Sequence, residues 1–176
     1  MILGLDVSTS ITGATVLDEN GSIVSCKAWD TRNKNRYEDI FAKANLIRLE
    51  LVKISHYHEI KKIYIEQSLQ SFRSGFSSAQ TLSTLSRFNG IVSWLCYKNF
   101  GIKPEYIAAT SARKLCGIKI PKGTKAKEIV LKYLLDNEDS FEVQYTKQGN
   151  PKPDSYDRAD SIVIAKAGYC LCNKKN

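Results

Sequence analysis

The sequence lacks any long hydrophobic run. No apolar stretch approaches the roughly 18–20 residues that a helix needs to cross a bilayer, which excludes a membrane-spanning protein. The first ten residues, MILGLDVSTS, have no positive segment ahead of their apolar run and place Asp6 inside it. This pattern argues against a secretory signal peptide. We therefore expect an intracellular, cytoplasmic protein.

Cysteine is scarce and irregularly spaced. The five cysteines include no C-x-x-C pair and are Cys26, Cys96, Cys116, Cys170 and Cys172. Neither histidine, His56 or His58, has a cysteine nearby, and the terminal C-x-C has no histidine at zinc spacing. We expect reduced, buried thiols in a reducing compartment rather than a disulfide framework or a structural zinc site.

Negative charge is in short supply. The chain of 176 residues has 26 Lys and Arg against 18 Asp and Glu, a formal charge of +8 and a pI near 9.2. Such an excess indicates a polyanionic partner such as nucleic acid, or an anionic membrane face. With 43% hydrophobic and 25% charged residues the composition is that of a globular protein. The length suits a single domain over residues 1–176.

The order of apolar patterns predicts the fold class. Residues 2–7, 12–17 and 22–29 read as a meander of strands, with Asn20-Gly21 as a hairpin signal. Helical spacing then predicts a helix over 37–55, and alternation predicts a strand over 60–66. A long helix over 78–100, a strand over 104–109, a helix from 126 and a helix over 155–170 follow. This order predicts an α/β domain in which helices flank a mixed five-stranded sheet.

Four acidic residues stand at the ends of these elements. Asp6 ends the first strand and Glu66 ends the strand over 60–66, so neighbouring strands would bring them together. Asp157 and Asp160 lie three residues apart near the start of the last helix and share one helical face. Converging carboxylates repel one another, and hard cations such as Mg²⁺ or Mn²⁺ relieve that repulsion. The set therefore predicts a metal site.

Each acid also has a simpler interpretation. Asp157 would be favoured by the dipole of its helix, with Asp154 or Ser155 as the cap. Asp160 would be an ordinary solvent-facing residue. The joint pattern of all four is more specific than any one member.

The positive charge is concentrated in one segment. Between residues 110 and 132 only Glu128 opposes the basic residues Arg113, Lys114, Lys119, Lys122, Lys125, Lys127 and Lys132. We interpret the segment as a surface for phosphate backbone, whose binding would depend on salt and little on base sequence. A merely solvated face is the alternative.

A Ser-rich loop over residues 67–78 follows Glu66. It contains Phe72, Arg73 and Phe76 among small polar residues. Aromatic side chains in such a basic loop can stack on unpaired bases or wedge between base pairs. The alternative is that one or both phenylalanines turn inward as core anchors.

Three segments carry a resemblance to a known family. The segments GLDVSTSITGATVLD, IYIEQ and DSYDRADSIVIA together resemble the RuvC-type Holliday junction resolvases of the RNase H-like superfamily, over nearly the whole chain. The resemblance implies a Mg²⁺-dependent, dimeric endonuclease that cuts four-way DNA junctions in DNA recombination and repair. It implies two Mg²⁺ ions per active site, which Mn²⁺ could replace, held by a catalytic tetrad of Asp6, Glu66, Asp157 and Asp160.

The resemblance also implies roles for basic and aromatic residues. Lys114 and Lys127 best match the family's active-site lysines, and Lys125 competes with Lys127. Phe72 best matches the aromatic residue that opens the junction, with Phe76 second. The turn after Asp6 lacks the family's frequent Pro-Gly, and the lysine segment lacks the usual Gly-rich stretch. Phage and other viral members diverge in similar ways, which is compatible with a viral origin and a host-cytoplasmic location.

We also expect the protein to form a dimer, and three other functions are alternatives to junction resolution. The helix over 78–100 is the expected dimer face because its apolar content exceeds what one packed side needs, in Phe88, Ile91, Val92, Trp94 and Leu95. One rival is a nuclease for other branched or RNA-containing substrates. Another is a catalytically silent junction-binding protein. A small actin-like phosphotransferase would need a second ATP-binding half.

Overall fold

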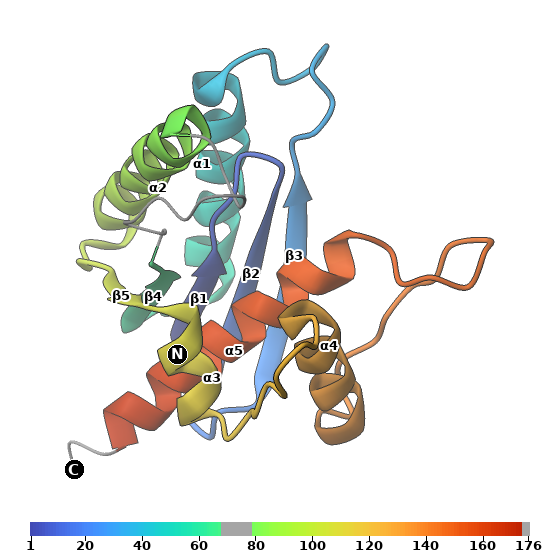
Figure 1. Ribbon diagram of the computed structural model, residues 1–176. Coiled ribbons are helices and arrows are strands. Elements are labelled where there is room, and N and C mark those ends of the chain that lie inside the picture. Colours follow the sequence, from blue (N-terminus) through green and yellow to red (C-terminus); the bar gives the residue numbers. More distant parts are fainter. Residues whose placement is uncertain (68–78, 174–176) are drawn as a thin grey trace.

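A five-stranded mixed sheet forms the centre of the computed structural model, which describes residues 1–67 and 79–173 (Figure 1). The strands lie in the order β3-β2-β1-β4-β5. Their bounds are β1 Ile2–Asp6, β2 Ile11–Leu17, β3 Ile23–Asp30, β4 Lys62–Glu66 and β5 Glu105–Ile107. The first three form an antiparallel meander, and β4 and β5 continue the sheet in parallel from β1. The predicted α/β class with a mixed five-stranded sheet is confirmed.

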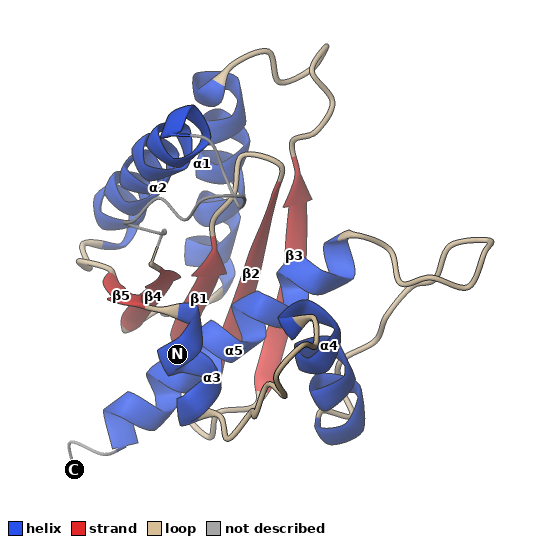
Figure 2. Ribbon diagram, in the orientation of Figure 1, coloured by secondary structure: helices blue, strands red, loops and turns tan. Residues whose placement is uncertain are grey.

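Helices cover both faces of the sheet (Figures 1 and 2). Their bounds are α1 Ile40–Tyr57, α2 Ala79–Phe100, α3 Ala109–Leu115, α4 Ala126–Asn137 and α5 Asp154–Asn173. The helices α1 and α2 pack together on one face, and α5 crosses β1 and β2 on the other, with α3 and α4 against it.

The alternation of β1 explains why one short strand supports two cores. Leu3 and Leu5 are fully buried in the cluster that includes α1 and α2, whereas Ile2 belongs to the cluster around α5. Gly4 also faces α5, and a Cβ there would lie 2.5 Å from the amide nitrogen of Ala165. The missing side chain therefore lets the backbone of α5 lie directly on the strand.

The first helix starts three residues later than expected from the sequence, and one short helix lies where none was expected. The first helix begins at Ile40 rather than residue 37, because the Asp39 side chain accepts hydrogen bonds from the amides of Phe41 and Ala42 at 2.8 Å each and caps it. The short helix α3 was not predicted from the sequence. The strand β5 ends at Ile107, and the seven residues of α3 begin at Ala109. The predicted strand over 104–109 therefore contains the boundary between a strand and a helix.

The structure also bears on the expected absence of a membrane-spanning helix and on the expected burial of the cysteine thiols. In the part of the chain that the structure describes, no helix combines the length and apolarity needed to cross a membrane. The five cysteines are unpaired. Only Cys96 is fully buried, and the other four are half-buried, so the expectation of buried thiols holds for one of them.

Candidate active site

Asp6 and the start of α5 meet at a glycine. The last residue of β1, Asp6, pairs with Gly13 of β2. A Cβ on Gly13 would lie only 1.9 Å from the backbone oxygen of Asp157 and 3.0 Å from the Cβ of Ser161. The hydroxyls of Thr15 and Ser161, 2.8 Å apart and buried, join β2 and α5 further along. Gly13 thus brings the acidic turn of α5 beside Asp6.

Glu66 reaches the same edge of the sheet from β4. The parallel pairing of β1 with β4 places Leu5 opposite Ile65, so Asp6 and Glu66 follow at matching ends of neighbouring strands. The amide nitrogen of the buried Asn89 side chain on α2 donates a hydrogen bond to the backbone carbonyl of Glu66 at 3.1 Å. Glu66 is therefore fixed by the sheet and by α2.

The pKa values of the carboxyl groups that meet at this edge of the sheet are raised. Burial, together with the charges of Glu66, Asp160 and Asp157, raises the pKa of Asp6 well above its usual range. Burial and the charge of Asp160 raise the pKa of Glu66 to about 7. We call Asp6, Glu66, Asp157 and Asp160 the carboxylate cluster. Its members come from β1, β4 and α5 and interact electrostatically.

The two acids of α5 share this environment. Burial raises the pKa of Asp157 to about 6, against the lowering charge of Lys127, and Asp160 adds to the rise. Burial also raises the pKa of Asp160, which Lys127 and Arg113 oppose. Both residues are half-buried. The simpler interpretation of Asp160 as a fully solvated residue is therefore wrong.

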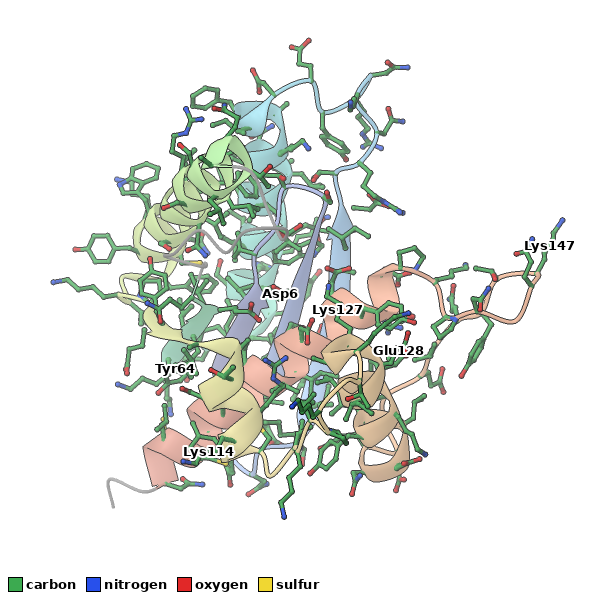
Figure 3. The ribbon with its side chains drawn as sticks, viewed as in Figure 1. Asp6, Tyr64, Lys114, Lys127, Glu128 and Lys147 are labelled. Carbon is green, nitrogen blue, oxygen red and sulfur yellow. The ribbon has the colours of Figure 1, made fainter. Side chains whose placement is uncertain are left out.

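Lys127 is the lysine that faces the carboxylate cluster. Its Nζ lies 3.9 Å from Oδ2 of Asp160, and Figure 3 shows it close to Asp6. Burial lowers its pKa, but the charges of all four cluster carboxylates outweigh burial and raise it. The competing residue, Lys125, instead pairs with Glu128 at 3.1 Å, and its side chain is 82% exposed.

The second cation at the cluster comes from α3. Arg113 lowers the pKa of both Glu66 and Asp160. Lys114, the residue matched to a family lysine, is exposed, and Figure 3 shows it far from Asp6. In this position the chain therefore presents a guanidinium rather than an ammonium group to the carboxylates.

A basic pocket adjoins this arginine. Its volume is about 500 Å³, and its lining includes Arg113, Lys114 and Lys119 together with Ile118 and Ile120. Among the residues that the structure describes, no acidic side chain lines it. Lys122 is exposed on the loop between α3 and α4. The loop residues Phe72, Arg73 and Phe76 lie outside the described residues.

The donor types of the cluster suit a hard divalent cation. Its four side chains offer only carboxylate oxygens, the ligands that Mg²⁺ and Mn²⁺ prefer. Burial and then neighbouring carboxylates raise the pKa values of Asp6 and Glu66, and a cation would relieve this repulsion. As placed, no three His, Cys, Asp or Glu side chains among residues 1–67 and 79–173 are arranged closely enough to hold a metal ion.

Asn89 was not among the predicted functional residues, and α2 buries more of its apolar residues than the sequence indicated. Asn89 sits among buried apolar residues of that helix, and a polar residue on an apolar face was the signal that could have found it. Of the apolar residues expected at a dimer face, Phe88, Val92 and Leu95 are buried in the core and Ile91 is half-buried. Trp94, 59% exposed, remains on the surface, joined by Tyr97.

Solved structures resemble this chain although sequence comparisons find nothing. No family model and no curated protein matches it. The Thermus thermophilus RuvC structure in complex with a Holliday junction substrate is 14% identical, with a TM-score of 0.67 over 98% of this chain and 94% of that one. A second T. thermophilus RuvC structure is 16% identical, with a TM-score of 0.62 over 99% and 96%.

A eukaryotic structure shows the same likeness. The yeast mitochondrial Holliday junction resolvase Ydc2 is 15% identical, with a TM-score of 0.63 over 98% of this chain and 79% of that one. A viral origin finds no support in these structures. The likeness to each of the three structures covers at least 98% of this chain. The chain therefore has the RNase H-like fold of the RuvC-type Holliday junction resolvases.

Proposed function

We propose that this protein is a metal-dependent endodeoxyribonuclease that resolves four-way DNA junctions by paired phosphodiester hydrolysis. The observation that carries the proposal is the carboxylate cluster, in which burial and neighbouring acids raise the pKa values of Asp6 and Glu66 beside Lys127. A fold with three junction-resolvase structures as neighbours supports the choice of substrate. Residues 1–176 would act as a single nuclease domain.

The chain's own residues have distinct roles in this proposal. Asp6, Glu66, Asp157 and Asp160 would hold two Mg²⁺ ions, or Mn²⁺ in their place, after their side chains draw closer together than they lie in this structure. When bound, such ions activate water and neutralise charge on a phosphodiester. Lys127, close to Asp160 and raised in pKa by the cluster, stays protonated and stabilises negative charge that builds on the phosphate. Arg113 adds a second fixed cation.

DNA binding would follow the basic segment. Arg113, Lys114 and Lys119 line the pocket beside the cluster, and Lys122 extends the charge along the loop. Phe72, Arg73 and Phe76 remain a sequence-based prediction for contact with unpaired bases at the junction. A homodimer through the exposed Trp94 and Tyr97 of α2 would place two active sites on opposed strands of a two-fold substrate.

The experiment that tests the proposal compares DNA substrates. A labelled four-way junction, a replication fork, an RNA–DNA hybrid and linear duplex are incubated with the protein in Mg²⁺ or EDTA. We expect paired nicks on the junction alone, and none in EDTA. Equal cutting of all substrates would identify a general nuclease. Tight junction binding without cutting in Mg²⁺ or Mn²⁺ would identify a silent junction-binding protein.

Neutralising the basic pocket should weaken binding of all DNA. For Lys114→Ala and Lys119→Ala we expect the slope of log binding constant against log salt to flatten by about 0.9 for each lysine, because each phosphate contact releases counterions. Fluorescence anisotropy with labelled duplex and junction at several salt concentrations measures this slope. Lys147→Ala, on the hairpin tip far from Asp6 in Figure 3, is the control and should keep the slope. Equal slopes in all four proteins would remove the pocket from the DNA-binding surface.

A further inference from the structure

We propose that Asn89 is a positioning residue for Glu66 and that a hydrogen-bonded chain through Ser93 and Tyr106 holds it in place. The inference rests on the proposed function, because it takes Glu66 as a metal-binding carboxylate. Asn89 touches neither substrate nor metal in this proposal. It acts by fixing the backbone from which the Glu66 side chain extends.

The burial of Asn89 is the first observation. Asn89 is 5% exposed and lies on the face of α2 that also buries Phe88, Val92 and Cys96. An apolar residue would pack there without loss, whereas a buried amide costs free energy unless it finds hydrogen-bonding partners. The partner of its amide nitrogen is the carbonyl of Glu66, at 3.1 Å.

The peptide group after Glu66 is held from two sides. Asn89 donates to its carbonyl oxygen, and its N–H group, which belongs to Gln67, donates to the backbone oxygen of Ile107 at 2.9 Å. One bond comes from α2 and the other from β5. Because a peptide group is planar, these two bonds fix its orientation and with it the direction in which the Glu66 side chain leaves the strand.

A chain of hydroxyl groups supports Asn89. The Ser93 hydroxyl donates to the backbone oxygen of Asn89 at 2.7 Å and lies 3.4 Å from its side-chain oxygen. The hydroxyl oxygen of Ser93 also lies 2.6 Å from the hydroxyl oxygen of Tyr106. Because the Ser93 proton is already donated to Asn89, the Tyr106 hydroxyl can donate to Ser93. Tyr106 is 50% exposed and pairs with Ile65, the residue before Glu66. The chain thus runs from the Glu66 carbonyl to the protein surface.

The contrast between two variants of α2 tests the proposal. Asn89→Leu keeps a similar shape but withdraws the amide donor, whereas Val92→Ala opens a cavity on the same buried face without touching Glu66. The readout is the Mg²⁺ concentration that gives half of the maximal rise in thermal stability. The half-saturating Mg²⁺ for junction cleavage is measured in parallel.

We expect Asn89→Leu to raise both half-saturating concentrations by about ten- to a hundredfold, the usual effect of losing an outer partner of a metal ligand. Val92→Ala should lower the melting temperature of the metal-free protein and leave both concentrations unchanged. Tyr106→Phe, which removes only the outer hydroxyl, should raise them by less than Asn89→Leu. Asn89→Ser also withdraws the amide and replaces Asn89→Leu if that variant does not fold.

Unchanged half-saturating concentrations in the Asn89 variant would overturn the inference, as would an equal shift in Val92→Ala. An unchanged value in Tyr106→Phe would overturn the part that extends beyond Asn89. A wild-type protein that neither gains stability from Mg²⁺ nor cuts junctions would contradict the proposed function instead. The two failures are therefore distinguishable.

Discussion

Replacing Asp6 by Asn should reduce junction cleavage by about a thousandfold, equivalent to roughly 4 kcal/mol of the several that a metal site contributes to the transition state. Asp6 stands at the end of β1, between Glu66 on β4 and the acids of α5. Asparagine keeps the shape but loses the charge that would share a cation with the other three carboxylates. Single-turnover cleavage of a labelled junction measures the loss.

The same substitution should stabilise the metal-free protein. Burial and three like charges raise the pKa of Asp6 well above its usual range, so its ionised form opposes folding at neutral pH. Removing that charge should raise the free energy of unfolding, because a pKa that folding raises means that the charged form destabilises the native state. The melting temperature in EDTA should therefore rise above that of the wild type.

The pH dependence follows with the same sign. The pKa of Glu66 rises from 4.5 to about 7 on folding and that of Asp157 from 3.8 to about 6. Between the unfolded and folded values the native state binds more protons than the unfolded state, so stability is highest at low pH and falls as the pH rises. In EDTA we expect this fall between about pH 4 and pH 7. Asp6→Asn should make it smaller, because it removes a buried acid whose own pKa is raised on folding.

An acid outside the cluster provides the control. Asp139 is exposed in the loop after α4, and Asp139→Asn should cut junctions and melt like the wild type. Wild-type cleavage by Asp6→Asn would exclude Asp6 from the reaction. A melting temperature of Asp6→Asn below that of the wild type in EDTA would show that the buried charge does not oppose folding.

The sequence was most informative where local patterns end at a defined edge. Asp6 and Glu66 each close an alternating apolar run, and parallel pairing of the two strands brings such ends together. Helical spacing alone predicts that Asp157 and Asp160 share one face of a helix. The fold class and the proximity of the four acids could therefore be predicted, because strand and helix periods are local properties of the chain; the role of these acids in catalysis stays a prediction.

Long-range contacts supplied what the sequence could not. Arg113 and Lys114 are adjacent, and only the position of the short helix α3 decides which of them acts on Glu66 and Asp160. Lys125 and Lys127 are likewise separated by the start of α4, which leaves Lys125 with Glu128. The bond from Asn89 to the Glu66 carbonyl spans 23 residues and has no sequence spacing of its own.

Gly13 lies where β2 and α5 come together beside Asp6, and Gly13→Ala should lower both the stability of the protein and its rate of junction cleavage. An alanine Cβ would lie 1.9 Å from the backbone oxygen of Asp157, and 2.6 Å from its carbonyl carbon, so the first turn of α5 must move away from β2. Backbone atoms cannot rotate aside as a side chain can. We expect a loss of about 1–3 kcal/mol of stability, the usual cost of overpacking a close contact.

The displacement should cost more in activity than in stability. Moving Asp157 and Asp160 by about 1 Å relative to Asp6 should slow junction cleavage by roughly a hundredfold, because such misplacement disrupts a site that depends on geometry. The matched control is Gly90→Ala on α2, where a Cβ meets no atom of the described residues within 4 Å. Alanine there should stabilise the helix by about 0.5–1 kcal/mol and leave cleavage unchanged. If Gly13→Ala cuts junctions at the wild-type rate, the reaction does not depend on the approach of α5 to Asp6. A rate loss in Gly13→Ala alone would tie cleavage to that approach, since both variants make the same chemical change.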